Sequence, residues 1–418
     1  MSSYNPYPAY KNSGIEWIGE VPEHWEIKPL KICVTHNDDV IPDSTHPEEL
    51  IKYVDISSVS YNEGISKAEE MVFGEAPSRA RRKAKVGDVI LSTVRTYLKA
   101  VASVDEEFAD CTFSTGFAVL RSRPNKIEPR FLKWLVLNDL FIQSVESHSE
   151  GLSYPAINPS TLVALKIALP SIEEQKKIAS VLETETMRID TLISKKSRFI
   201  ELLTEKILAM VTHAFEYEDT KWIRLRHVCN LINRPVNQQN GESYTRLGLY
   251  NRGRGAFKKA EADNEDMGDS DFFWVEEGDL ILSGQFAWEG AVALATDEHS
   301  KCLVSHRFPI IHGRKGEALT EYLFAFFMTH YGDFILNDCS RGSAGRNRPL
   351  NINALLLWKV PIPSLELQTK IASLINLREK ILRQTQHSID LLKERRTALI
   401  TAAVTGKIDI RNKQESIP

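Results

Sequence analysis

The chain has few cysteines, and none of them stands close to another. Its 418 residues include five, and these are Cys33, Cys111, Cys229, Cys302 and Cys339. No C-x-x-C pair is present, so the spacing argues against a zinc site and is typical of buried thiols in a reduced compartment. We therefore expect a cytoplasmic protein without a bound metal ion.

Long apolar runs are also missing. No stretch approaches the roughly 20 apolar residues that a membrane-spanning helix needs. The first fourteen residues, MSSYNPYPAYKNSG, have no apolar core of the kind that secretory signals carry. We expect no membrane association and no secretion.

The chain has no excess of positive charge. Its 52 Lys and Arg residues stand against 56 Asp and Glu residues, which gives a formal net charge of -4. A protein that bound nucleic acid with this balance would have to use local basic patches or charges supplied by partners.

Catalytic signatures are absent as well. The sequence contains no G-x-x-x-x-G-K-[ST] or G-x-G-x-x-G loop, no H-E-x-x-H pair and no Asp/Asn-Pro-Pro-aromatic tetrapeptide of the kind that amino-methyltransferases use. Asp43, Glu49 and Lys52 faintly resemble a nuclease carboxylate cluster, but their polar surroundings favour an ordinary loop. We predict that the chain itself catalyses nothing and uses no cofactor.

What the chain does contain is an internal repeat. PSIEEQKKIASVLE (Pro170–Glu183) returns 193 residues later as PSLELQTKIASLIN (Pro363–Asn376), with 8 of 14 positions identical, including Gln175 and Gln368. VGDVILS (86–92) corresponds to EGDLILS (277–283). Cys111, Ser114 and Phe117 correspond to Cys302, Ser305 and Phe308, each 191 residues later. The chain is therefore two copies of one unit, roughly 1–215 and 216–418.

Each copy ends in a long helical pattern. Neither 171–213 nor 366–405 contains glycine or proline, and apolar residues recur at steps of three and four. About 40 residues of helix measure roughly 60 Å, and the apolar stripe of one such helix needs a partner, for which its own repeat is the obvious candidate. The first helix carries four extra residues between matched blocks, which is close to one turn. Mixed short strands and helices precede each long helix.

The repeat and its local signatures resemble the specificity subunit of type I restriction-modification systems. The signatures are SGIEWIGEVPEHWEIKPLK, the segment LPSIEEQKKIASVLE with its continuation, and LLKERRTALITAAVTGKIDI near the end. The resemblance implies an α/β (α+β) fold with two target-recognition domains, each reading half of a gapped DNA site. It also implies that the long helices pair as an antiparallel coiled coil, space the domains and dock two adenine-methyltransferase subunits, with motor-nuclease subunits joining the complex. The corresponding boundaries are 1–168 and 216–361 for the domains, 169–215 and 362–408 for the helices, and 409–418 for a tail.

Three basic stretches are candidate DNA contacts. They lie at 79–85, at 250–259, and at 340–349, on loops or in glycine-rich sequence where cations neutralise phosphates and arginine reads guanine. The alternative is that each run is a solvated face. The candidate residues are Arg79, Arg81, Arg82, Arg252, Arg254, Lys258, Lys259, Arg341, Arg346 and Arg348.

Two equivalent segments, LSTVRTYLKAVA (91–102) and LSGQFAWEGAVA (282–293), share a strand but differ at the tip. A shared frame with divergent polar tips is what two readers of different half-sites would have, whereas two ordinary hairpins would also differ there. An arginine at such a tip suits guanine and a glutamine suits adenine. The candidate residues are Arg95, Tyr97 and Lys99 in the first copy, and Gln285 and Trp288 in the second.

The sequence thus predicts a non-catalytic subunit that binds double-stranded DNA. The competing hypothesis is a coiled-coil scaffold for protein assembly that binds no DNA. The paired cysteines, together with Trp25 and Trp222, are expected to lie in the core.

Overall fold

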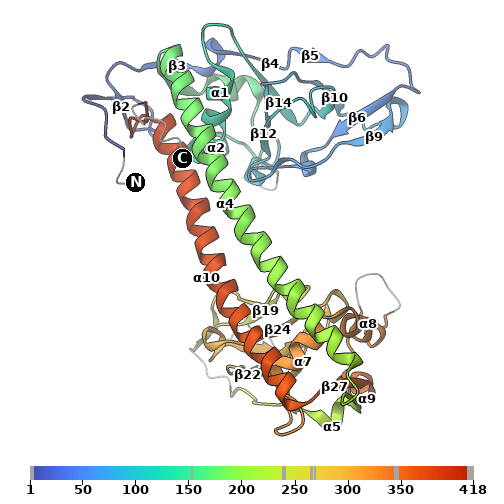
Figure 1. Ribbon diagram of the computed structural model, residues 1–418. Helices are drawn as coiled ribbons and strands as arrows, with labels where there is room; N and C mark the ends of the chain where they lie inside the picture. Colours follow the sequence, from blue (N-terminus) through green and yellow to red (C-terminus); the bar gives the residue numbers. More distant parts are fainter. Residues whose placement is uncertain are drawn as a thin grey trace. The chain divides into compact units, whose positions relative to one another are not determined.

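The computed structural model describes residues 4–151, 154–237, 242–263, 267, 270–342 and 348–411. The chain forms two compact units (Figure 1). Unit 1 combines Met1–Ile193 with Ile389–Pro418, and unit 2 is Ser194–Ser388. Both units mix helices with short strands, so the predicted α/β class is confirmed.

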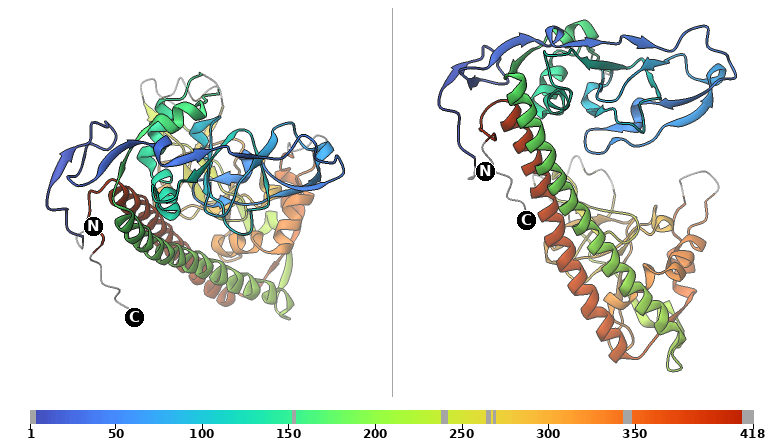
Figure 2. Two further views of the ribbon diagram at one scale, coloured as in Figure 1. Left: turned by 90° about the horizontal axis from the view of Figure 1, so that it is seen from above. Right: turned by 45° about the horizontal axis from the view of Figure 1, so that its top comes forward.

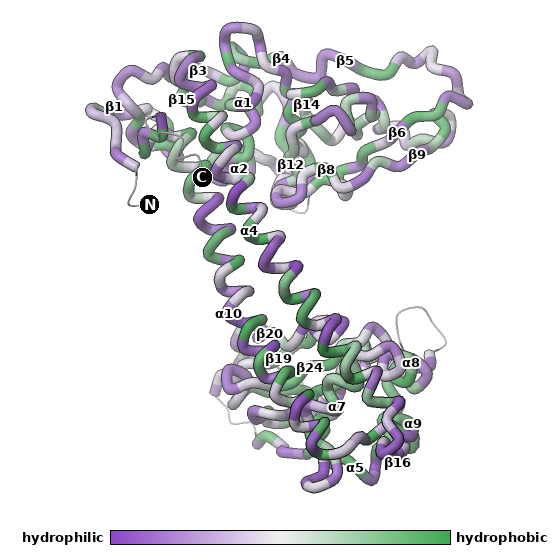
Figure 3. Tube along the Cα trace, viewed as in Figure 1, coloured by the Kyte–Doolittle hydropathy of each residue, from purple (hydrophilic) through white to green (hydrophobic). Residues whose placement is uncertain are grey.

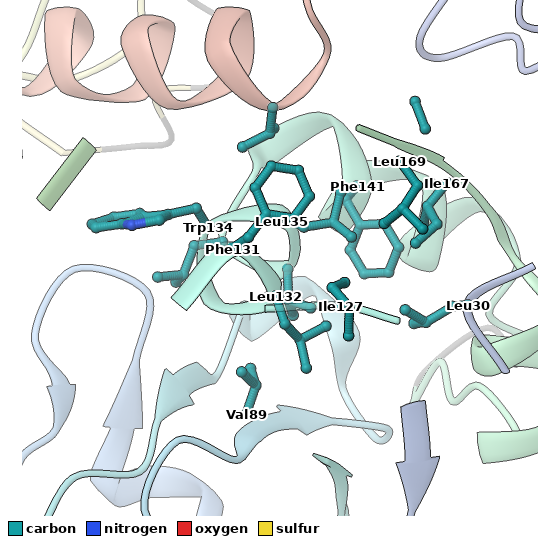
Figure 4. Close-up of a cluster of buried hydrophobic side chains, with 14 of the residues drawn as sticks. Leu30, Val89, Ile127, Phe131, Leu132, Trp134, Leu135, Phe141, Ile167 and Leu169 are labelled. Atoms are coloured by element: carbon teal, nitrogen blue, oxygen red, sulfur yellow. The ribbon is translucent and has the colours of Figure 1, made fainter. Parts of the chain in front are cut away.

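A four-stranded antiparallel sheet lies at the centre of unit 1, in the order β12-β11-β14-β4. One of its two central strands, β11 (Val89–Ser92), is buried along its whole length and follows the predicted Gly-Asp turn. The helix α1 (Pro129–Val136) covers this sheet, and Figure 4 shows Phe131 and Leu132 gathered with Val89. The other strands are β4 (Val34–His36), β12 (Val101–Ser103) and β14 (Phe117–Ser122).

Unit 2 repeats this sheet strand for strand. Its order is β17-β26-β23-β24, again antiparallel throughout. In the described part of each unit, three short helices lie between the sheet and the long helix, so the internal repeat of the sequence is a repeat of the fold. The strands are β17 (Cys229–Ile232), β23 (Leu280–Leu282), β24 (Val292–Leu294) and β26 (Ile310–Gly313). The helices are α2 (Asp139–Ser147) and α3 (Pro159–Ala164) after α1 in unit 1, and α7 (Thr320–Phe327), α8 (His330–Asp338) and α9 (Ile352–Leu357) in unit 2.

The units differ in their additional strands. Unit 1 has a five-stranded sheet, β5-β10-β13-β6-β9, in which β13 and β6 pair in parallel. In unit 2 the described strands of this region form three separate antiparallel pairs, β18-β21, β19-β20 and β22-β25. The bounds in unit 1 are β5 (Asp39–Val40), β6 (Leu50–Val54), β9 (Glu69–Val72), β10 (Ala80–Lys83) and β13 (Thr112–Ser114). Those in unit 2 are β18 (Ser243–Tyr244), β19 (Leu247–Leu249), β20 (Ala256–Lys258), β21 (Ala262–Asp263), β22 (Phe272–Trp274) and β25 (Leu303–Ser305).

A pair of strands joins the start of each unit's globular part to the segment before its long helix. β3 (Glu26–Pro29) pairs with β15 (Lys166–Leu169) in unit 1. In unit 2, β16 (Lys221–Arg224) pairs with β27 (Lys359–Ile362) in the same way. The remaining short elements are β1 (Tyr10–Asn12), β2 (Glu20–Pro22), β7 (Val59–Ser60), β8 (Gly64–Ile65) and α5 (Leu225–Val228).

The buried core confirms most of the residues expected there. All five cysteines are free and buried, and burial raises the pKa of the Cys229 thiol to about 11, so this thiol is not reactive at neutral pH. Trp25 is fully buried. The expectation for Trp222 was wrong, because this side chain is 45% exposed. It lies on β16 and lines a shallow hollow with Tyr331 and Trp358.

Two long helices, α4 (Ile172–His213) and α10 (Leu365–Val404), contribute to both units (Figure 2). In unit 1, Ile178 and Leu182 of α4 share a core with Ile400 and Val404 of α10. In unit 2, the late α4 residues Ile207 and Val211 share the core with the early α10 residues Ile371 and Ile375. The start of one helix therefore packs beside the end of the other in each unit, which confirms the antiparallel pairing. Figure 3 shows apolar and polar residues alternating along both helices.

The repeated glutamine has the same role in both units. Gln175 accepts a hydrogen bond from the Glu128 backbone N–H and donates one to the Pro170 carbonyl, both at 2.8 Å. Gln368 accepts from the Leu319 N–H at 2.9 Å and donates to the Pro363 carbonyl at 2.9 Å. Glu128 and Leu319 are the N-cap residues of α1 and α7. Each glutamine therefore joins the start of a long helix to the helix that covers the central sheet.

Candidate nucleic-acid interface

In unit 1, three loops meet where β11 ends. The Thr93 N–H donates to the Gly116 carbonyl at 2.7 Å, and the Ile157 N–H donates to the Thr93 carbonyl at 2.9 Å. The Arg95 N–H donates to the Pro155 carbonyl at 2.7 Å. We call this the unit 1 junction, and it comprises residues 93–99, 114–117 and 154–157.

Unit 2 has the same junction at the equivalent positions, residues 284–290, 305–308 and 348–350. The Gly284 N–H donates to the Arg307 carbonyl at 2.6 Å, and the Leu350 N–H donates to the Gly284 carbonyl at 2.8 Å. A Cβ atom on Gly284 would lie 2.3 Å from the Arg307 carbonyl oxygen. The close approach of these two backbones therefore requires glycine at this position.

A buried aspartate fixes the start of the strand that leads to each junction. Asp88 accepts from the Lys85 N–H at 2.8 Å and from Arg121 at 2.7 and 3.0 Å. Asp279 accepts from the Glu276 N–H at 2.8 Å and from Arg234 at 2.9 Å. These repeated hydrogen bonds hold the strand beneath the tip.

Burial raises the pKa of the Asp279 carboxyl, but hydrogen bonds from His312 and Arg234 outweigh this effect and hold the pKa below its ordinary value. Asp279 therefore stays ionised and paired at neutral pH.

The predicted tip residues of unit 1 lie at the junction. Arg95 has a left-handed backbone, with φ 51°, and precedes the 3-10 turn 96–98. Its guanidinium carbon lies 4.8 Å from the centroid of the Tyr154 ring. Tyr97 is 53% exposed. Lys99 is engaged elsewhere, because its Nζ lies 2.7 Å from Asp139 Oδ1.

The predicted tip residues of unit 2 lie at the equivalent place. The Trp288 Nε1–H donates to the Gln285 carbonyl at 3.1 Å, within the turn 287–289. The Arg348 guanidinium carbon lies 4.9 Å from the Trp288 ring centroid. The structure therefore brings Gln285, Trp288 and Arg348 together. Arg346 lies outside the described residues.

The predicted basic hairpin at 250–259 is attached to the unit 2 junction. The Arg252 N–H donates to the Glu289 carbonyl at 3.1 Å, and the Gly253 N–H donates to the Gly290 carbonyl at 2.9 Å. Arg254 bonds to Asn251 and lies 5.5 Å from the Tyr250 ring centroid. Exposed cations of this hairpin are Arg252, Arg254, Lys258 and Lys259.

The basic run at 79–85 is only partly available to a ligand. Arg79 donates to Asp55 at 2.8 Å and to the Tyr53 hydroxyl at 3.0 Å. Arg81 lies 3.9 Å from Asp43 and 5.0 Å from the Phe73 ring. Burial lowers the pKa of Arg82. A phosphate would have to compete with these internal partners, although Arg79 is joined to the unit 1 junction through the bond from the Thr115 N–H to its carbonyl.

The last predicted cation, Arg341, follows α8. Its side chain is 80% exposed and forms an ion pair with Asp338 on that helix. Like Lys99 and Arg79, it has a carboxylate partner within its own unit.

Sequence reasoning missed three exposed side chains at the junctions, namely Tyr154 in unit 1 and His306 and Arg307 in unit 2. A hollow of about 410 Å³ in unit 2 is lined by Gln285, His306, Arg307 and their neighbours. The repeat offered a signal for the last two, because the matched residues Ser305 and Phe308 bracket them. No comparable sequence match marks Tyr154.

The faint nuclease-like cluster forms no recognisable site. Asp43 is 98% exposed and pairs with Arg81. Among the residues that the structure describes, no group of three or more His, Cys, Asp or Glu side chains is arranged to hold a metal ion. No helix in the same described ranges is both long and apolar enough to cross a membrane.

Comparison with known proteins agrees with this architecture. Residues 23–202 match the model of the type I restriction modification DNA specificity domain. A Methanocaldococcus jannaschii protein named for the MjaX type I restriction enzyme specificity subunit is 28% identical over 213 residues, which covers 47% of this chain and 47% of the relative. The MjaVIII specificity subunit of the same organism is 28% identical over 207 residues, covering 46% and 47%. The chain thus matches about half the length of these curated relatives.

A solved structure from a study of complex assembly and conformational transition in a type I R-M system has the same fold. It superposes with a TM-score of 0.60 at 22% identity and covers 93% of this chain and 99% of its own. The matched domain model and the two named relatives each cover less than half of this chain. Over residues 23–202, the chain is thus similar to the type I restriction modification DNA specificity domain.

Proposed function

We propose that the chain is the DNA sequence-recognition subunit of a type I restriction-modification complex, and that each unit reads one half of a gapped site through its junction. One observation carries this proposal. The two junctions share two backbone hydrogen bonds but present different side chains, Arg95 and Tyr97 in unit 1 against Gln285 and Trp288 in unit 2. A common frame with different polar side chains suits the reading of two different sequences.

The charges at the junctions support this role. Among the described residues, Arg95, Arg252, Arg307 and Arg348 form no ion pair with a carboxylate. Their N–H groups are therefore available to phosphate oxygens or base edges. Four other basic candidates, Arg79, Arg81, Lys99 and Arg341, would first have to leave a carboxylate partner.

Partner proteins would compensate for the chain's net charge of -4. The long helices expose large apolar side chains, which mark protein-binding surfaces when they gather on a polar helix. These side chains are Met187, Leu192, Phe199, Leu202, Leu365, Leu377 and Leu391. We assign to these helices the docking of two adenine-methyltransferase subunits, with motor-nuclease subunits completing the complex.

In this proposal the chain is non-catalytic, and residues 1–168 and 216–361 are its target-recognition domains. Residues 169–215 and 362–408 act as spacers, and 409–418 form a tail. A helix of 42 or 40 residues is long enough, at about 1.5 Å per residue, to set a fixed separation between half-sites.

The test is to co-express the chain with its methyltransferase subunit and map N6-methyladenine at single-base resolution across the host genome. A gapped, two-part motif that disappears when this chain is omitted is the expected result. A stable complex with no chain-dependent motif would refute DNA recognition and favour a protein scaffold.

A further inference from the structure

An arginine stacks on an aromatic ring at both junctions, but the two loops exchange roles. In unit 1 the arginine is on the tip, as Arg95, and the ring is on the loop after α2, as Tyr154. In unit 2 the ring is on the tip, as Trp288, and the arginine is on the loop after α8, as Arg348. The separations between guanidinium carbon and ring centroid are 4.8 and 4.9 Å.

Stacking of this kind uses only part of the guanidinium. The ring occupies one planar face through a cation–π contact, whereas the N–H donors point outward in the plane of the group. A stacked arginine therefore keeps its bidentate edge free for a ligand and loses rotamer freedom before the ligand arrives.

Among the described residues, three other arginines also lie over a ring, and each has a polar partner within the chain. Arg254, which lies over Tyr250, donates to Asn251. Arg81, which stacks on Phe73, also lies 3.9 Å from Asp43. Arg411, which stacks on Tyr7, bonds to Asp409 at 2.6 Å. Among the described residues, Arg95 and Arg348 have no such carboxylate. Arg81 and Arg411 therefore form an ion pair as well as the ring contact, whereas the charges of Arg95 and Arg348 have no carboxylate partner among the described residues.

We propose that Arg95 and Arg348 each read a guanine in the major groove, one in each half-site, and that Tyr154 and Trp288 are the positioning residues that hold them. Guanine fits because its O6 and N7 are adjacent acceptors that match the two parallel donors of a guanidinium edge. The proposal rests on the proposed function and adds which base each unit reads and through which pair of residues.

The exchange of loops makes the two pairs independent of each other. A Tyr154 variant should change recognition of one half-site by removing the aromatic ring. An Arg348 variant should change recognition of the other half-site by removing the cation. Loss of the arginine should reduce discrimination at one base pair about 5- to 150-fold, which corresponds to about 1–3 kcal/mol for a bidentate contact. Loss of the ring should reduce it about 2- to 5-fold, as for an exposed cation–π contact.

The experiment uses the full chain assembled with its methyltransferase subunit and duplexes randomised in one half-site at a time. Relative methylation of each base pair is measured for Arg95→Ala, Tyr154→Leu and Tyr154→Phe, and for Arg348→Ala, Trp288→Leu and Trp288→Phe. Tyr154 is 65% exposed, so its variants should fold as the wild type does. The phenylalanine variants keep a ring and are the matched controls.

We expect Arg95→Ala and Tyr154→Leu to relax the same G·C pair of one half-site and Tyr154→Phe to preserve it. Arg348→Ala and Trp288→Leu should relax one G·C pair of the other half-site. The Arg95→Ala/Tyr154→Leu double variant should match Arg95→Ala alone, because the ring acts through the arginine. Relaxation at different positions, additive effects, or a uniform loss at all sequences would overturn the proposal.

The outcome for the wild-type complex separates this proposal from the proposed function. If wild-type methylation follows a two-part motif and Tyr154→Leu leaves it unchanged, only the stacking proposal fails. If wild-type methylation shows no sequence preference that depends on this chain, the proposed function fails with it.

Discussion

Gln175 and Gln368 make equivalent side-chain hydrogen bonds in the two units, and replacing Gln175 with methionine tests how much these bonds contribute to stability. Methionine has a similar length and keeps the packing volume, but it removes both amide hydrogen bonds, to the Glu128 N–H and to the Pro170 carbonyl. The side chain is only 1% exposed, so water cannot readily replace the lost partner.

The size of the effect follows from those two bonds. Leaving a buried polar group without its partner costs about 1–3 kcal/mol. Two such groups in Gln175→Met therefore predict a loss of about 2–6 kcal/mol in the stability of unit 1. Gln368→Met should cost unit 2 at least as much, because Gln368 also donates to the Glu317 carbonyl at 3.2 Å.

Native-state hydrogen exchange is the appropriate assay, because two units need not unfold together. Gln175→Met should lower amide protection in α1, and Gln368→Met should lower it in α7. The control is Lys176→Met, at a neighbouring exposed lysine that pairs with Glu173 on the surface, with an expected loss below about 1 kcal/mol. Equal losses in Gln175→Met and Lys176→Met, or loss of protection in the wrong unit, would refute the role of the glutamine.

Three further predictions concern charge, positioning and spacing. Because the pKa of Asp279 is lowered in the folded protein, its contribution to stability is present above the unfolded pKa of about 3.9 and is lost as the pH falls through the folded pKa. Asp279→Asn should cost about 1–3 kcal/mol at pH 7 and flatten the acid limb of a stability–pH curve measured by urea unfolding. An unchanged acid limb would contradict this. Arg378, 3% exposed, pairs with the buried Glu379 and donates to Thr204 at 2.9 Å and to the Gly253 carbonyl at 3.3 Å. Because Arg378→Met leaves the Glu379 carboxylate buried without its cation, it should destabilise unit 2 by about 3–5 kcal/mol in thermal unfolding and increase hydrogen exchange at 250–255. The control Arg383→Met, at an exposed ion pair, should cost less than about 1 kcal/mol. Deleting four residues between Glu183 and Ile200, about one helical turn or 6 Å, should alter the spacer of the methylated motif and leave both half-sites unchanged, and a changed half-site with the same spacer would count against the helices as spacers.

The fold could be predicted from the sequence because the two copies of the repeat share the residues that form equivalent elements. Matched blocks such as VGDVILS and EGDLILS mark the same buried strand in both central sheets. The long helices were predictable because an uninterrupted apolar periodicity without glycine or proline has no other stable outcome in water.

The candidate interface was less predictable, because its geometry depends on residues far apart in the chain. The charge run at 79–85 gave no sign that Asp55 and Asp43 would reach it from loops elsewhere in unit 1. Nor could it be anticipated that Tyr154 would meet Arg95 across 59 positions. Trp222 was misassigned because a tryptophan near a strand start is more often buried, whereas here the hollow beside it has no cover among the described residues.

The junctions are held together by backbone groups. The bonds between Thr93, Gly116 and Ile157, and their counterparts in unit 2, use main-chain N–H and carbonyl groups. Apart from the glycine demanded at position 284, most side chains at these loops can therefore change with little effect on folding, since exposed substitutions away from special backbone sites usually alter stability by less than about 0.5 kcal/mol. Residues that determine binding preference can therefore change without affecting the residues that maintain the structure. Descendants of one gene can acquire new binding preferences through a few surface replacements while remaining equally well folded.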